Sequence, residues 1–115
     1  SMLAKKFRLK KETDIKKVLQ EGRFLKNKYL RIKYKKNNAE YSRFATPVGL
    51  KVSKKAVTRN KIKRRLQEIL RLNWENIKPS YDVLVMVSPT IKEKKYQQIE
   101  KTLLELLRQA QLLKQ

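Results

Sequence analysis

The chain has 115 residues, the length of one domain, and its 31 Lys and Arg against 10 Asp and Glu give a formal net charge of +21. It contains no cysteine and no histidine, which excludes disulfides, thiol nucleophiles, histidine general bases and the common zinc sites. A surface this basic favours a polyanionic partner, and nucleic acid is the strongest candidate.

The first third of the chain predicts a helix and then a two-faced strand. Residues 12–21 place Ile15 and Leu19 on one face of a helix, and Gly22 ends it. In residues 28–35 apolar and polar side chains alternate strictly, which is typical of a half-buried strand. One face carries Leu30, Ile32 and Tyr34, and the other carries Tyr29, Arg31 and Lys33.

Shorter segments flank this strand. Residues 23–26 predict a short strand before it, and the polar residues 37–40 predict the loop of a hairpin after it. Residues 43–53 predict the returning strand. Its inward side chains are Val48, Leu50 and Val52. Because Pro47 has no N–H to donate, we expect this strand at an edge or a bulge.

The second half of the chain alternates helix, strand and helix. From about Ala56 the periodicity is helical, and Pro79 bounds the segment. Its apolar stripe comprises Ile62, Leu66, Ile69, Leu70 and Ile77. Residues 81–88 predict a buried strand, and residues 96–113 predict a long amphipathic helix. The sequence therefore predicts one α+β domain over residues 1–115, a small mixed sheet with three helices, of which one sheet face stays open.

A long basic segment lies between Glu40 and Glu68, with nine basic residues and no acid. They are Arg43, Lys51, Lys54, Lys55, Arg59, Lys61, Lys63, Arg64 and Arg65. A solvated helix usually mixes signs at i, i+4, whereas Lys61 and Arg65 repeat the same sign at that spacing. We therefore expect RNA or DNA phosphates to supply the missing negative charge.

The basic residues of the predicted helix fall on two faces. Arg59 and Lys63 lie beside the apolar stripe and can extend toward the open sheet face. The outward face carries Lys61, Arg64 and Arg65. Arginine suits bidentate phosphate contact, and Asn60 can form hydrogen bonds with sugars or base edges. One helix is thus predicted to offer two RNA-binding surfaces.

Residues 52–55 read Val-Ser-Lys-Lys, and residues 59–61 in the following helix read Arg-Asn-Lys. Four further motifs lie along the chain: Phe-Arg-Leu-Lys at 7–10, Gly22, Val-Gly-Leu at 48–50 and Tyr-Asp-Val-Leu-Val at 81–85. Together these motifs resemble the bacterial ribonuclease P protein family, whose helix carries Arg-Asn-Arg after a Val-Ser-Lys-Lys strand end. The resemblance covers nearly the whole chain.

This resemblance implies an α/β sandwich with a left-handed βαβ crossover, against the prevailing handedness. It also implies the protein subunit of a ribonucleoprotein endoribonuclease that removes the 5′ leader of precursor tRNA. The catalytic RNA would carry the chemistry with Mg²⁺, and the protein would hold neither a catalytic residue nor a metal. Its partners would be that RNA and the precursor tRNA leader.

Two sets of site residues follow from the resemblance by position. The set expected to contact the RNA subunit is Lys54, Lys55, Arg59, Asn60, Lys61, Arg64 and Arg65. The leader would lie in a cleft between the first helix and the sheet. The residues expected to line it are Ile15, Leu19, Tyr29, Arg31, Lys33, Lys51, Arg59 and Lys63.

The chain departs from the family in two places. Ile15 and Leu19 stand where many members have aromatic residues, and from periodicity alone they are equally compatible with the cleft and with the core. Base stacking contributes about 1–3 kcal/mol per base, so Tyr29 becomes the expected stacking residue. The loop after Lys55 is also shorter than in many members and has no glycine.

Two other function classes are compatible with a basic chain of this length. A protein nuclease is disfavoured, because there is no histidine and Glu12 and Asp14 diverge on a helix. A structural RNA-binding protein, such as a ribosomal component, is compatible with the composition. The longest apolar run, residues 83–87, is far shorter than the ~20 residues that a membrane span needs. With no secretion signal at the N-terminus, we expect a cytoplasmic protein with no membrane partner.

Overall fold

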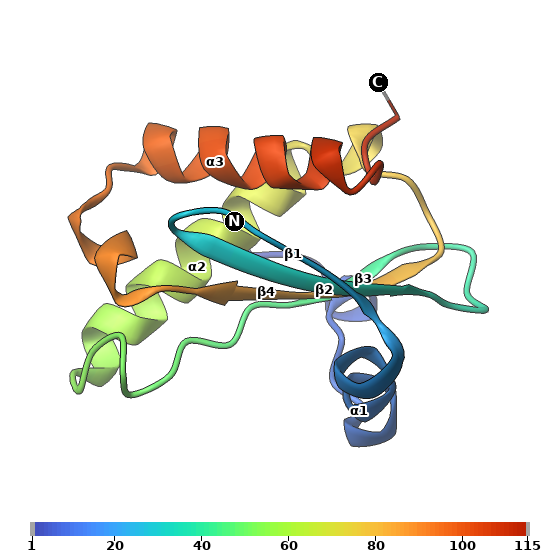
Figure 1. The fold of residues 1–115 in the computed structure, drawn as a ribbon, viewed down its shortest axis with the longest axis horizontal. Helices are drawn as coiled ribbons and strands as arrows, with labels where there is room; N and C mark the ends of the chain where they lie inside the picture. The colour runs from blue at the N-terminus through green and yellow to red at the C-terminus, as the bar shows by residue number, and fades with distance from the viewer. Residues whose placement is uncertain (1, 115) are drawn as a thin grey trace.

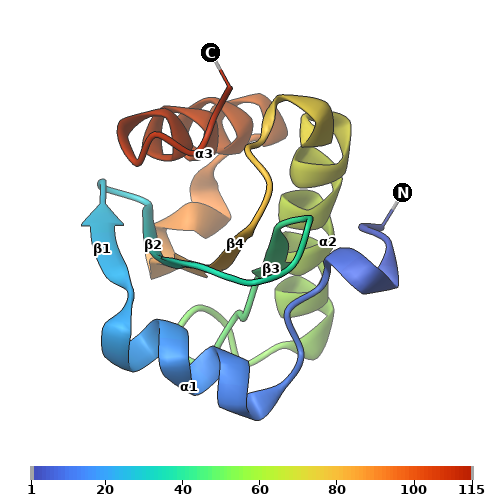
Figure 2. The same cartoon turned by 90° about the vertical axis from the view of Figure 1, so that its right-hand side faces the viewer.

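A computed structural model describes residues 2–114. Its main elements are α1 (Glu12–Glu21), β1 (Arg23–Lys26), β2 (Leu30–Lys36), β3 (Arg43–Ala45), α2 (Ala56–Leu72), β4 (Tyr81–Val87) and α3 (Tyr96–Gln109). The strands form one mixed sheet in the order β1-β2-β4-β3. Helices α2 and α3 cover one face and α1 lies against the other (Figures 1 and 2). The α+β fold with three helices is confirmed.

The larger core lies between the sheet and helices α2 and α3. Alternation along β2 sends Leu30, Ile32 and Tyr34 into it, as the sequence predicts. The apolar stripe of α2 packs against these side chains. Its fully buried members are Leu66, Ile69 and Leu70. This packing explains why a helix with so many cations is stable, since burial of one apolar face outweighs their mutual repulsion.

A smaller apolar cluster holds α1 on the opposite face of the sheet. Val18 of α1 is buried against Leu9 and Leu84. The helix ends at Gly22, whose N–H donates to the Val18 carbonyl over 2.9 Å. A side chain at this position would collide with that carbonyl, so only glycine fits between α1 and β1. Because the apolar cluster is small and the chain turns into β1 directly after Gly22, α1 covers only part of this face of the sheet.

The predicted strand over residues 43–53 is wrong beyond Ala45. Strand β3 lies at the sheet edge, and residues 46–55 form a loop in which Leu50 is 68% exposed. Pro47 explains the early end, since it cannot donate to a ladder. The predicted hairpin between β2 and β3 is also wrong, because β4 lies between them, antiparallel to β2 and parallel to β3. Thus β3, α2 and β4 form a βαβ unit. The left-handed crossover of this unit stays a prediction.

Two apolar residues of the predicted helices lie outside them. Helix α2 ends at Leu72, and the Asn73 side chain donates to the Ile69 carbonyl over 2.8 Å. Ile77 and Leu113 follow their helices and pair with each other in an isolated bridge, where both are buried. Because both are apolar and fall at helical spacing, the sequence predicts them as the last residues of each helix's apolar stripe. Within residues 2–114 no helix is both long and apolar enough to cross a membrane.

Candidate nucleic-acid interface

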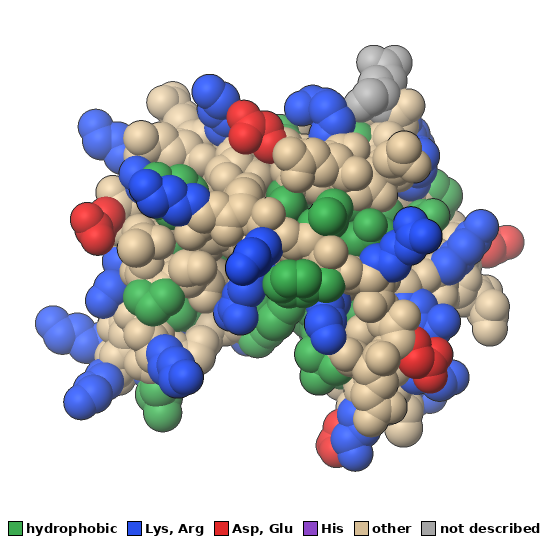
Figure 3. All heavy atoms as spheres, in the orientation of Figure 1, with side chains coloured by type: hydrophobic (Ala, Val, Ile, Leu, Met, Phe, Trp, Pro, Cys, Tyr) green, Lys and Arg blue, Asp and Glu red, His purple; other side chains and the backbone are tan. Residues whose placement is uncertain are grey.

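The part of the sheet face that α1 does not cover borders a surface hollow between α1 and the start of α2. Strand register places Phe24 beside Lys33, and Arg31 between Lys26 and Met86. Side chains in register on neighbouring strands point to the same face, so these residues share one surface. Figure 3 shows the molecule hollowed between the lobe that carries α1 and the lobe at the start of α2, with hydrophobic and basic side chains around the hollow. This combination suits a single-stranded nucleic acid.

Helix α1 contributes unequally to this surface. Ile15 is half-buried against the small cluster under the helix, whereas Leu19 is an exposed apolar side chain. The Lys33 ammonium donates to the Leu19 carbonyl over 2.6 Å, at the C-terminal end of α1 where the helix dipole favours a cation. Of the two residues left open by the sequence, Ile15 thus contacts the small cluster while staying partly exposed, and Leu19 is the more exposed of the two.

Tyr29 does not lie on the open face, so its predicted alignment with Arg31 is wrong. Strand β2 begins one residue later, at Leu30, and Tyr29 belongs to a turn in which the Asn27 carboxamide oxygen accepts its N–H over 3.0 Å. Its ring packs against the larger core, with the Lys94 ammonium 4.6 Å from the ring centroid. The hydrogen bond to Lys94 lowers the pKa of the Tyr29 hydroxyl.

Phe24 is the aromatic residue that the sequence analysis missed. Its side chain is 47% exposed in the middle of β1, which is unusual for phenylalanine. A four-residue strand is too short for periodicity to assign its faces. Only the pairing of Phe24 with Lys33 identifies the face, and this pairing depends on the turn that precedes β2. Phe24, and not Tyr29, is therefore the exposed aromatic side chain on this face.

The loop over residues 46–55 brings further cations to the hollow. Lys51 and Arg31, both predicted to line the cleft, line one cavity of about 690 Å³ together with Lys26. The Arg59 guanidinium donates to the Ser53 carbonyl over 3.0 Å and so fastens this loop to the first turn of α2. Arg59 therefore positions the loop, in addition to any contact it makes with RNA.

The N-terminal end of α2 is strongly electropositive. It begins after Lys55, has no acidic residue in its first turn and has no side-chain cap from any described residue. Free N–H groups and the helix dipole favour an anion at such an end. Lys54 and Lys55 are both exposed beside it. The end of the helix and its two lysines together concentrate positive charge, which suits a phosphate group.

Within residues 2–114 the cations along α2 form no ion pair with a carboxylate. The ion pairs found within residues 2–114 join α1, β2, β3 and β4 and include no residue of α2. Lys61, Arg64 and Arg65 line a shallow surface depression together with Glu68, with which none of them forms an ion pair. Arg64 also lines a cavity with Asn60 and Lys63 on the side facing β3, so it lies between the two faces that the sequence predicts. The charge of this helix remains available to a partner.

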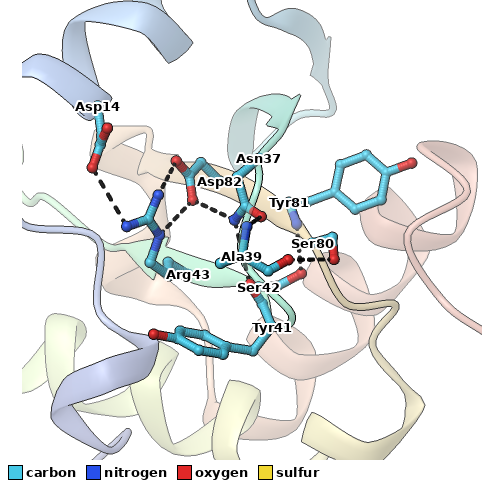
Figure 4. A network of polar contacts seen from close by, with 9 residues as sticks. All are labelled: Asp14, Asn37, Ala39, Tyr41, Ser42, Arg43, Ser80, Tyr81 and Asp82. Carbon is cyan, nitrogen blue, oxygen red and sulfur yellow. Dashed lines mark hydrogen bonds and ion pairs between the residues drawn. The ribbon is translucent and has the colours of Figure 1, made fainter.

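A polar network fixes α1 relative to the sheet. The Arg43 guanidinium donates two 2.8 Å hydrogen bonds to the Asp82 carboxylate and lies 3.4 Å from Asp14 of α1 (Figure 4). Asn37 donates to the same Asp82 carboxylate over 2.8 Å. The bond to Asp82 raises the pKa of Arg43, so its charge is permanent. The network joins α1, β3 and β4 at one side of the hollow. Its residues are far apart in the sequence and follow no periodic pattern, so the sequence does not predict it.

The described residues contain no group of three or more acidic, histidine or cysteine side chains that could hold a metal ion. The site therefore consists of cations, an exposed aromatic ring and apolar side chains. These groups can bind phosphates and bases.

The chain is similar to known proteins over nearly all of its length. The model of the family Ribonuclease P matches residues 3–111. The ribonuclease P protein component of Alkaliphilus metalliredigens is 41% identical over 92% of this chain and 95% of its own, and that of Clostridioides difficile is 38% identical over 90% and 91%. The ribonuclease P protein of Thermotoga maritima superposes with a TM-score of 0.81 at 32% identity, covering 89% of this chain and 96% of its own. A Staphylococcus aureus ribonuclease P protein mutant, described as defective in mRNA degradation activity, gives 0.87 at 27%, covering 94% and 91%.

Proposed function

Because the chain belongs to the ribonuclease P protein family, we propose that it binds a catalytic RNA and the 5′ leader of precursor tRNA and assists endonucleolytic removal of that leader. In this proposal the RNA subunit holds Mg²⁺ and carries the phosphodiester chemistry. The protein reduces electrostatic repulsion between the two RNAs and positions the leader.

The hollow beside α1 is the observation that carries this proposal. Phe24 supplies an exposed π-face, and Lys26, Arg31 and Lys33 surround it with positive charge. Stacking on aromatic rings together with backbone-tracking cations is the usual way of holding single-stranded RNA with little dependence on its sequence. A processing enzyme meets leaders of many sequences, and this surface suits that requirement.

The outer face of α2 is the proposed contact with the catalytic RNA. Lys61, Arg64 and Arg65 border one surface depression with Glu68, and none of the three belongs to an ion pair among residues 2–114. This surface faces away from the apolar core. The protein can therefore bind a folded RNA on one side and a single strand in the hollow.

The direct test is cleavage of precursor tRNA by a bacterial ribonuclease P RNA at low Mg²⁺, with and without this protein. We expect efficient cleavage and an intact 5′ leader only when both components are present, because the protein replaces part of the charge neutralisation by Mg²⁺. Binding of the RNA without any change in cleavage would favour a structural RNA-binding protein. Cleavage by the protein alone would favour a protein nuclease.

Replacing Phe24 with alanine should weaken binding of precursor tRNA about tenfold and leave binding of mature tRNA unchanged. The expected loss corresponds to one base stack of about 1–3 kcal/mol. The measurement is the Kd of the assembled enzyme for each substrate. Leu72→Ala is a matched control, since Leu72 is also an exposed apolar residue but lies at the far end of α2. Equal losses for the two tRNAs would remove Phe24 from the leader surface.

A further inference from the structure

A small cavity of about 330 Å³ lies between one end of the sheet and the C-terminal end of α3, at the end of the molecule that faces the viewer in Figure 2. Its walls come from the starts of β1 and β4, the end of β2, Lys78 and the turn after α3. The Lys78 N–H donates to the Leu112 carbonyl over 2.8 Å and so attaches the segment before β4 to the segment after α3. The walls are therefore held in place by the fold itself.

Positive charge dominates the lining of this cavity. The lining contains four cations and one acid, which are Arg23, Lys35, Lys36, Lys78 and Glu21. Glu21 lies 3.5 Å from Lys35, and the other three cations belong to no ion pair within residues 2–114. Cations that border so small a cavity repel one another, so an anion bound among them would be stabilised.

The C-terminal end of α3 does not use these cations as its cap. Gln111 follows the helix with a φ of 61°, and its N–H donates to the Arg108 carbonyl over 2.9 Å. The Leu112 N–H donates to the Leu107 carbonyl over the same distance. This backbone pattern satisfies carbonyl groups of the last helical turn. Since no cation of the cavity donates a side-chain hydrogen bond to α3 within the described chain, the cations stay available to a ligand.

The wall of the cavity also carries a hydroxyl group that no other described residue uses. Tyr34 lines the cavity and is only 8% exposed, because its ring packs into the larger core. No side-chain hydrogen bond within residues 2–114 involves its hydroxyl. The enclosed side-chain oxygens without a partner belong to Thr46, Gln67 and Tyr96, so the Tyr34 hydroxyl is not enclosed. A fixed ring thus holds an accessible O–H donor beside a group of cations, which suits an oxyanion.

We propose that this cavity binds one backbone phosphate of an RNA strand, which its unpaired cations attract and to which the Tyr34 hydroxyl donates a hydrogen bond. Lys36 and Arg31 lie near opposite ends of β2, about 15 Å apart along the strand. The Tyr34 ring is on the α3 side of the sheet, whereas Arg31 is on the side of the hollow. The site is therefore separate from the hollow and from the outer face of α2. The proposal rests on the RNA-binding function proposed above and adds a third contact to it.

The first test adds inorganic phosphate to the intact protein at constant ionic strength and follows backbone amide shifts by NMR. We expect the amides of Tyr34, Lys36 and Gln111 to respond. Tyr34→Phe should weaken phosphate binding there about tenfold, because one hydrogen bond to a charged group is lost. The amides at the start of α2, another electropositive place, should respond alike in both proteins. No response around Tyr34, or unchanged affinity in Tyr34→Phe, would overturn the proposal.

Tyr96→Phe is the matched control, because it also removes an unpartnered tyrosine hydroxyl, but an enclosed one. This variant should bind phosphate as the wild type does. In chloride without phosphate, Tyr34→Phe should keep the Tm of the wild type, since the ring stays and no hydrogen bond within the described chain is lost. Equal losses of phosphate affinity in the two variants would assign the effect to core packing and overturn the proposal.

The phosphate can belong to the catalytic RNA or to precursor tRNA, and the Kd for each RNA distinguishes these sources. Arg23→Gln/Lys36→Gln removes two cations of the cavity, and Lys92→Gln/Lys101→Gln removes two exposed cations elsewhere as a control of equal charge. We expect the first variant to bind one of the two RNAs about tenfold more weakly, with the slope of log K against log salt shallower by about one. Tyr34→Phe should weaken binding of the same RNA without changing the slope.

The RNA that responds is the source of the phosphate. If the two double variants behaved alike toward both RNAs, the proposal would be overturned. The proposed function would stand in that case, since it depends on cleavage of precursor tRNA at low Mg²⁺.

Discussion

Replacing Asp82 with alanine is expected to lower the free energy of unfolding by about 2–3 kcal/mol. The Asp82 carboxylate is only 9% exposed and accepts hydrogen bonds from both Arg43 and Asn37. Its removal leaves the guanidinium partly buried with Asp14 as its remaining carboxylate neighbour. The cost is below the 3–5 kcal/mol of a fully buried pair, because the Arg43 side chain is one-quarter exposed. Urea denaturation measures this difference.

The matched control is Glu21→Ala, which removes the ion pair of Glu21 with Lys35. The two charged groups of this pair are 3.5 Å apart and their side chains are 58% and 37% exposed. Exposed pairs of this kind contribute about 0–1 kcal/mol, so little change in stability is expected. If Asp82→Ala were no more costly than Glu21→Ala, the polar network around Asp82 would add nothing to the stability of the fold.

The double variant Arg64→Ala/Arg65→Ala is expected to bind the catalytic RNA about 10–100-fold more weakly at moderate salt. Arg65 lies on the outer side of α2 and Arg64 at its border with the side facing β3, and neither has a carboxylate partner among the ion pairs of residues 2–114. If each one neutralises a phosphate, the slope of log K against log salt should become shallower by up to about 1.8. Filter binding at several salt concentrations measures both quantities.

A control of equal charge separates specific contact from the loss of net charge. Lys101→Ala/Arg108→Ala also removes two exposed cations, but from α3. We expect a small, uniform loss of affinity and almost no change of slope. Should the two double variants behave alike, the RNA would be responding to total charge, and the outer side of α2 would lose its assignment as the docking surface.

The elements with long, regular patterns could be predicted from the sequence. Helix α1 spans the expected residues 12–21, because burial of one helix face produces a period that a single sequence displays. Strand β4 nearly matches its predicted range, because a strand buried on both faces appears as a continuous apolar run. The loop after β3 could not be predicted in this way. Val48, Leu50 and Val52 alternate like a strand, yet the β-ladder stops at Ala45, where the edge strand ends before Pro47.

The candidate site was predictable to the extent that charge determines it. The cations of α2 and of the open face occur where the sequence indicates, whereas the aromatic residue does not. A one-residue difference in the start of β2 takes Tyr29 off the open face, and the pairing of β1 brings Phe24 onto it. Arg23 and Lys78 lie far apart in the sequence, so only the folded chain reveals that they line one cavity.

The central position of β4 also has a consequence for how the chain folds as it is synthesised. Strands β2 and β3 both pair with β4, which is the last strand to leave the ribosome. Until Val87 has emerged, these strands have no partner for the edges that later meet β4, and α2 has only part of its sheet to pack on. Pairing over such long sequence separations is slow, and unpaired strand edges are prone to aggregation. We therefore expect folding to begin only near the end of translation, with the high positive charge keeping nascent chains apart until then.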